Sequence, residues 1–75
     1  MLAQQVVGTS GPVAAAEEAG RILGMDAPRV LLLDGVAYLE GTVPSFRQKK
    51  AAAEIIGLLT GAPHVINRLR VAPSP

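Results

Sequence analysis

The spacing of apolar side chains divides the chain into five segments. Apolar residues recur at helical spacing in residues 12–23 and 46–60, which predicts two helices. Three other segments either alternate apolar with polar residues or are apolar almost throughout, which predicts strands at residues 29–34, 36–43 and 64–71. The expected order is therefore helix, strand, strand, helix, strand.

The first predicted helix has signals at both ends. Gly11 suits the cap position, Pro12 suits the first turn, and Gly24 can end the helix. The apolar stripe expected to face the core consists of Val13, Ala16, Ala19, Gly20, Ile22 and Leu23.

The second predicted helix is bounded in a similar way. Ser45 followed three residues later by Gln48 is a capping-box pattern, and Gly61 is a plausible left-handed stop. Gly57 and Gly61 together are expected to give a close packing point and a C-cap. The core-facing stripe is expected to be Ala52, Ile55, Ile56 and Leu59.

Asp34-Gly35 predicts a tight hairpin between the first two strands, because a type I′ turn needs two residues with positive φ. Pairing across this turn places Leu33 opposite Val36 and Leu31 opposite Tyr38. One face of the hairpin then carries Val30, Leu32, Ala37, Leu39 and Val43. The other face carries Arg29, Leu31, Leu33, Val36, Tyr38 and Glu40.

In the last strand, alternate residues also point to opposite faces. Val65, Asn67, Leu69 and Val71 are expected to point toward the helices, and Ile66, Arg68 and Arg70 away from them. An inward-pointing asparagine needs hydrogen-bond partners, so Asn67 is expected to tie down a loop or a helix end.

These elements predict an α+β fold in the form of a two-layer sandwich. The strand–helix–strand crossover makes the last two strands parallel, which gives a three-stranded mixed sheet. Each helix has one apolar stripe, so both helices belong on the same face of the sheet. The expected division is a lead-in at residues 1–11, a single domain at 12–72 and a tail at 73–75. Residues 2–7 are compatible with a short additional edge strand.

This arrangement leaves one sheet face uncovered. An apolar centre with a charged rim is typical of a protein interface. The candidate interface residues are Leu31, Leu33, Val36, Tyr38, Ile66, Arg68 and Arg70. The leading interpretation is association with a second copy or another protein. The alternatives are that residues 1–11 or an adjoining domain cover the face, or that a lipid surface does.

A basic cluster marks the start of the second predicted helix. Arg47, Lys49 and Lys50 oppose the helix dipole there, so local stability does not explain them. A helix N-terminus with added cations favours an anion, and a phospholipid phosphate would suit it. The competing interpretation is a solvated face whose charges serve solubility.

Composition excludes several other classes of function. The 75 residues carry a net charge of +1, which argues against duplex DNA as a partner. The chain has no cysteine and one histidine, His64, so it offers neither disulfides nor a thiolate or histidine metal cluster. Two aromatic residues are too few for a base-stacking platform. Gly8-Thr9-Ser10-Gly11 matches the loop of a KH domain, but too little chain precedes it for the expected strand and helix.

The sequence also lacks a nucleophile constellation and a phosphate-binding loop, so we expect no catalysis, cofactor or small-molecule substrate. No apolar run is long enough for a membrane span. The N-terminus does not have the pattern of a signal peptide. We therefore expect a cytoplasmic protein, or a periplasmic one from which a leader has been removed.

Three stretches together resemble a BON domain: V-x-L-x-D-G-V-A-x-L-x-G-T-V-P-S at residues 30–45, A-x-x-I-I-x-x-L-x-G at 52–61 and V-x-N-x-L-x-V at 65–71. The resemblance implies the same helix–strand–strand–helix–strand sandwich. It also implies a non-enzymatic module of bacterial envelope and stress proteins, associated with phospholipid binding or protein–protein assembly. The family has no shared set of binding residues, so the resemblance implies no site.

Overall fold

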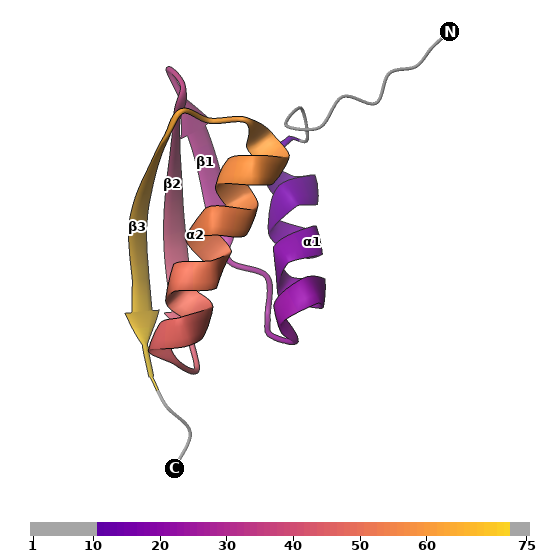
Figure 1. Ribbon diagram of the computed structural model, residues 1–75, viewed down its shortest axis with the longest axis vertical. Coiled ribbons are helices and arrows are strands. Elements are labelled where there is room, and N and C mark those ends of the chain that lie inside the picture. Colours follow the sequence, from indigo (N-terminus) through magenta and orange to yellow (C-terminus); the bar gives the residue numbers. More distant parts are fainter. Residues whose placement is uncertain (1–10, 73–75) are drawn as a thin grey trace, which may run out of the picture.

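Two helices cover one face of a three-stranded sheet in the computed structural model, which describes residues 11–72 (Figure 1). The chain runs through α1 (Pro12–Leu23), β1 (Arg29–Leu33), β2 (Val36–Val43), α2 (Phe46–Thr60) and β3 (His64–Val71). The predicted α+β sandwich and its element order are confirmed. The short edge strand considered at residues 2–7 lies outside the described residues.

The sheet has the strand order β1-β2-β3, with β1 antiparallel and β3 parallel to the central β2. Leu33 pairs with Val36 and Leu31 with Tyr38, as the turn chemistry predicted. Asp34 has φ 49° and Gly35 has φ 77°, so both turn residues have the positive φ of a type I′ turn. The turn therefore sets which side chains of the hairpin face the helices.

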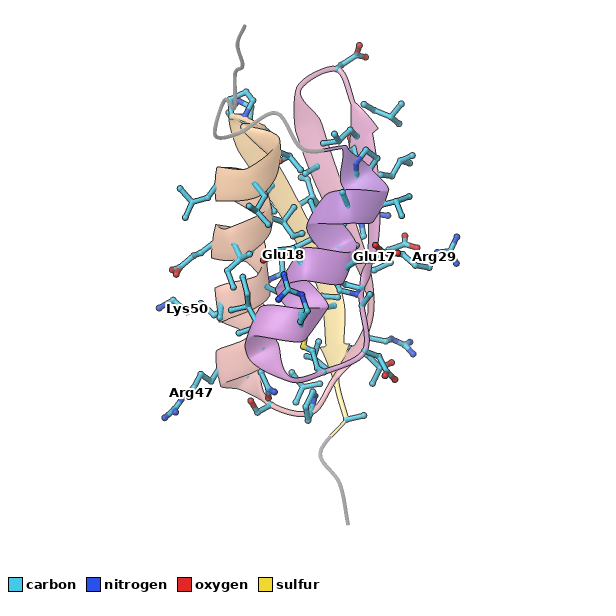
Figure 2. The ribbon with its side chains drawn as sticks, turned by 90° about the vertical axis from the view of Figure 1, so that its right-hand side faces the viewer. Glu17, Glu18, Arg29, Arg47 and Lys50 are labelled. Atoms are coloured by element: carbon cyan, nitrogen blue, oxygen red, sulfur yellow. The ribbon has the colours of Figure 1, made fainter. Side chains whose placement is uncertain are left out.

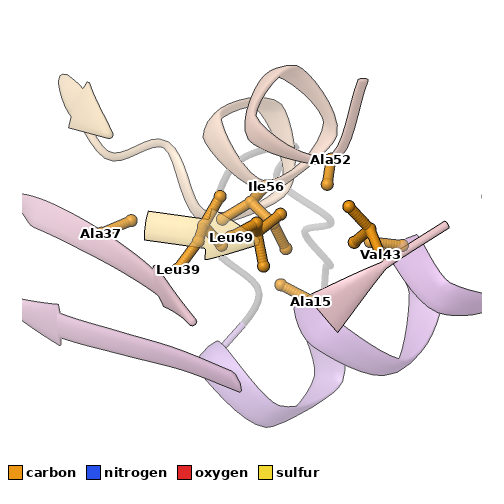
Figure 3. Close-up of a cluster of buried hydrophobic side chains, with 8 residues drawn as sticks. Ala15, Ala37, Leu39, Val43, Ala52, Ile56 and Leu69 are labelled. Carbon is orange, nitrogen blue, oxygen red and sulfur yellow. The ribbon is translucent and has the colours of Figure 1, made fainter. Parts of the chain in front are cut away.

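The core lies between the sheet and the helices and is built largely from small side chains (Figure 3). Its largest fully buried residues are Leu39, Val43, Ile56 and Leu69. The alanines around them are Ala15, Ala19, Ala37 and Ala52, each with 0% exposure. Alanines at these positions let the helix backbones approach the sheet closely, which suits the thin core of so short a chain.

The predicted core face of α1 is wrong at two positions. Val13 and Ile22 are 69% and 56% exposed, whereas the buried residues of α1 are Ala15, Ala16, Ala19 and Gly20. A Cβ added at Gly20 would lie 2.9 Å from the carbonyl oxygen of Met25, so the helix passes tightly against the chain that follows it. Such close packing admits small side chains, so Val13 and Ile22 are left on the solvent side, whereas Leu23 packs against the core.

The ends of α2 follow the predicted signals, with one difference. The Ser45 Oγ accepts a hydrogen bond from the Gln48 backbone N–H at 3.2 Å. The Gln48 side chain does not complete a capping box at Ser45 N–H. Its Nε2 instead donates to the carbonyl of Leu23 at 3.3 Å, which joins the start of α2 to the end of α1. Gly61 ends the helix at φ 70°, with its N–H bonded to the Gly57 carbonyl.

The predicted apolar stripe of α2 is confirmed. Ala52 and Ile56 are buried, and Ile55 and Leu59 are partly buried against the same core. Gly57 is a close packing point as expected, because a Cβ there would lie 3.4 Å from a methyl of Val65.

Candidate interaction surface

The register of the sheet arranges the uncovered face in rows that cross all three strands. The row nearest the hairpin turn is Leu33, Val36 and His64. The next row is Leu31, Tyr38 and Ile66. The third row is Arg29, Glu40 and Arg68, and beyond it Thr42 lies beside Arg70. The face is therefore apolar toward the hairpin turn and charged toward the other end.

The apolar rows are accessible on the described surface. Leu31, Leu33 and Ile66 are 54%, 52% and 42% exposed, and Val36 and Tyr38 are half-buried. Leu39, the neighbour of Tyr38 on the opposite face of β2, is fully buried. The structure thus places all five apolar residues of the candidate interface together, on the face opposite the helices.

A polar cluster borders these apolar residues. Arg68 Nη1 lies 3.9 Å from Glu40 Oε2, and the Arg68 guanidinium lies 5.8 Å from the centroid of the Tyr38 ring. The ion pair is largely exposed and is worth little by itself. Arg68 thus lies across the sheet between the Glu40 carboxylate and the Tyr38 ring. Arg70 is exposed at the charged end of the face.

A shallow hollow of about 350 Å³ lies where the apolar and charged rows meet. It is lined by Arg29, Val30, Leu31, Leu33, Tyr38, Glu40 and Arg68. Such a mixture of apolar walls and guanidinium groups is typical of protein interfaces.

The basic cluster of α2 forms a second surface. Arg47 and Lys50 project outward from the helix (Figure 2). Lys49 turns back, with its Nζ 5.6 Å from the centroid of the Phe46 ring. Together with Asn67, these residues line a hollow of about 410 Å³.

The sequence interpretation missed Phe46. Its side chain is 72% exposed within the basic cluster, although large aromatic side chains usually bury most of their area. The signal that was available is an aromatic residue directly after the helix cap, followed by three cations within four positions.

Asn67 has the structural role expected of it. Its side chain joins β3 to α2 by a hydrogen bond to the Lys49 backbone carbonyl. This contact fixes where the basic cluster sits relative to the sheet.

Residues 11–72 contain no group of three or more histidine, aspartate or glutamate side chains placed to hold a metal ion. Neither α1 nor α2 is long and apolar enough to cross a membrane.

The comparison with protein families decides the identity of this sandwich. The sequence model of the BON domain matches residues 13–73. The chain belongs to the BON domain family. The match covers every helix and strand except Pro12, the first residue of α1, so the resemblance seen in the sequence is confirmed. No curated protein matches the chain.

Proposed function

We propose that this BON domain is a non-catalytic interaction module that associates with itself or with another protein through its uncovered sheet face. The observation that carries the proposal is the pair of apolar rows, in which Leu31, Leu33 and Ile66 remain about half exposed side by side. Covering such a side chain completely stabilises a complex by about 1.5–3 kcal/mol, before the costs of association are subtracted.

The charged rows contribute specificity to this surface. Arg68, Arg70 and Glu40 lie at one end of the face, so a partner must align its own apolar and charged groups with them. Charges at the rim of an interface mainly steer encounter and orientation, and the apolar centre supplies most of the affinity.

Solution mass measured by light scattering over a range of protein concentrations tests this proposal. We expect a discrete oligomer for the unmodified chain and a shift to monomer for Leu33→Asp, because the new carboxylate must be desolvated at the interface. Leu58→Asp is the matched control, since Leu58 is 68% exposed on α2 and lies away from the sheet face. A mass that stays the same in Leu33→Asp, with the fold retained, would exclude assembly through this face.

A monomer at every concentration would exclude self-association. In that case the face is covered by residues 1–11, by an adjoining domain or by a different protein. Circular dichroism melts of both variants show whether a loss of assembly comes from the surface or from unfolding.

A second candidate function is peripheral binding to anionic phospholipid, which the exposed Phe46 ring beside Arg47, Lys49 and Lys50 favours. Three cations contribute on the order of 3 kcal/mol of attraction to an anionic surface, which is weak without an apolar anchor. Phe46 is suited to be that anchor, because an aromatic ring beside cations inserts at the boundary between headgroups and acyl chains.

Vesicle sedimentation tests the lipid candidate. Phosphatidylglycerol vesicles should bind the chain, phosphatidylcholine vesicles should not, and added salt should weaken the binding. We expect Phe46→Ser and Lys49→Glu with Lys50→Glu each to reduce it. Binding that is indifferent to salt and to these substitutions would exclude the basic cluster as the lipid contact.

A further inference from the structure

His64 lies at the apolar end of the uncovered sheet face. It begins β3, its side chain is exposed, and it shares the row nearest the hairpin turn with Val36 and Leu33. Ile66 in the next row is its neighbour on the same face of β3. The imidazole therefore stands beside apolar side chains and away from the charged rows at the other end of the face.

The position of His64 makes it a corner of the surface that association would cover. The proposed contact is carried by three side chains that are about half exposed, Leu31 and Leu33 on β1 and Ile66 on β3. They occupy three corners of a rectangle about 7 Å long along the strands and about 10 Å wide across them, and His64 occupies the fourth. A partner that covers the three apolar corners lies over the imidazole as well.

The charge of His64 is the one on this face that changes near neutral pH. His64 is the only histidine of the chain, which has no cysteine. Carboxylates ordinarily titrate below about pH 5 and arginines above about pH 12, whereas histidine exchanges its proton between about pH 5 and 8. Burying an imidazolium costs more free energy than burying a neutral imidazole, because the charge loses its hydration.

The charged groups of the sheet do not pair with His64. Glu40 on β2 and Arg68 on β3 lie two rows away, about 13 Å along the strands, and they pair with each other. Arg29 on β1 lies in that same distant row. Asp34 is in the hairpin turn at the end of the sheet where His64 lies, and within residues 11–72 the two side chains form no ion pair.

The remaining ionisable groups near β3 do not offset the charge of an imidazolium. Tyr38, in the next row on β2, ordinarily stays neutral below about pH 9. α2 packs against β3 from the other layer, so its charged residues lie on the opposite side of the sheet (Figure 1). These residues are Arg47, Lys49, Lys50 and Glu54.

We infer that His64 makes association through the uncovered face pH-dependent, so that a second copy covers it as the neutral imidazole and acidification separates the copies. The inference rests on the proposed self-association and adds its regulation. Separated chains bind more protons than assembled ones, because their imidazoles are free to take up a proton. The dissociation constant therefore rises as the pH falls.

The expected effect follows from the number of imidazoles that the contact covers. Each imidazole that must lose its proton before it is covered weakens association about tenfold between about pH 7.5 and 5.5. A two-fold interface uses the same patch of both copies, so it covers two of them. The dissociation constant of such a dimer should rise about 100-fold over this range.

Sedimentation equilibrium at pH 7.5 and 5.5, at equal ionic strength, tests the inference. The unmodified chain should assemble at the higher pH and separate at the lower one. His64→Gln is the matched variant, because glutamine keeps a polar side chain of similar size but takes up no proton. We expect His64→Gln to assemble equally at both pH values.

A second variant tests the same position without a change of pH. His64→Lys places a cation on the face at both pH values, so it should be largely monomeric at both. Circular dichroism of each variant at each pH shows whether the fold is retained.

The outcomes separate this inference from the proposed function. Assembly that is equal at both pH values, and that Leu33→Asp abolishes, would overturn the role of His64 and retain the sheet-face contact. Acid dissociation that persists in His64→Gln would also overturn it, because another group would then carry the pH dependence. Stronger assembly at the lower pH would overturn it by showing that the second copy supplies an anion to the imidazolium. A monomer at both pH values and every concentration would overturn both the inference and self-association.

Discussion

Asn67 in β3 donates a hydrogen bond from its Nδ2 to the backbone carbonyl of Lys49 in α2, at 2.8 Å. The Asn67 Oδ1 also accepts the backbone N–H of Leu69 at 3.2 Å. One side chain thus joins a helix to the edge strand beside it, and it positions the basic cluster above the sheet.

Asn67→Ala should lower the free energy of unfolding by about 1–3 kcal/mol, because the Leu69 N–H loses its acceptor and β3 loses its hydrogen bond to the Lys49 carbonyl of α2. Urea denaturation measures this change. Asn67→Asp keeps the acceptor for Leu69 but loses the donor to Lys49, so it should also destabilise the fold. Wild-type stability in both variants would show that the contact contributes nothing.

Gly20→Ala should destabilise the protein even though alanine is the better helix former by about 1 kcal/mol. The added Cβ would lie 2.9 Å from the backbone oxygen of Met25 and 3.0 Å from the Cα of Ala27, and neither atom can turn aside. Gly57→Ala is the matched control in α2, where the Cβ would meet a Val65 methyl at 3.4 Å. We expect a lower melting temperature for Gly20→Ala and an unchanged or higher one for Gly57→Ala. If Gly20→Ala had the higher melting temperature of the two variants, residues 25–27 would have to move away from the added Cβ at little cost in free energy.

Leu39→Ala and Leu31→Ala should differ greatly in their effects, although both are leucines of the same hairpin. Leu39 is fully buried, so its truncation should cost about 2–5 kcal/mol of stability. Leu31 is 54% exposed, and its truncation should change the stability of the monomer by about 0.5 kcal/mol or less. Denaturation at a concentration low enough to keep the chain monomeric compares the two. Similar losses would indicate that the face bearing Leu31 is already covered.

Gly35→Ala should destabilise the hairpin by about 1–2 kcal/mol, because residues with a side chain disfavour the left-handed region. Gly35 has φ 77°, and its Cβ would meet Pro63 side-chain atoms at an ordinary 3.6 Å, so the expected cost is conformational and not steric. Asp34→Asn is the control, since asparagine tolerates the φ of 49° at that position. Equal stability of Gly35→Ala and the unmodified chain in thermal melts would contradict this account.

The turn and cap residues made much of the fold predictable. Asp34-Gly35 set the hairpin register, and the register then decided which leucines face the helices. Ser45 and Gly61 marked the ends of α2, because capping is a local interaction between residues a few positions apart. The apolar members of the candidate interface followed from the same alternation, since side chains on a strand point to opposite faces in turn.

The errors arose where distant segments meet. Val13 and Ile22 are apolar at helical spacing, yet they face outward, because α1 packs against the sheet and α2 through its small residues Ala15, Ala16, Ala19 and Gly20. The Gln48 side chain bonds the Leu23 carbonyl of the other helix, a partner that no local pattern indicates. The exposure of the Phe46 side chain was not predicted either, because the spacing of residues along a helix does not show how much of a side chain remains exposed.

The sequence by itself determined the elements, the hairpin register and the division of the sheet into two faces, because these depend on backbone preferences and on side-chain alternation over a few residues. Tertiary structure decided which face of α1 is buried and how closely the helices approach the sheet. It also brought Glu40, Tyr38 and Arg68 together, and it left Phe46 exposed beside the cations of α2. Those outcomes depend on the volumes of side chains that meet from distant parts of the chain, so they are settled only when the layers pack.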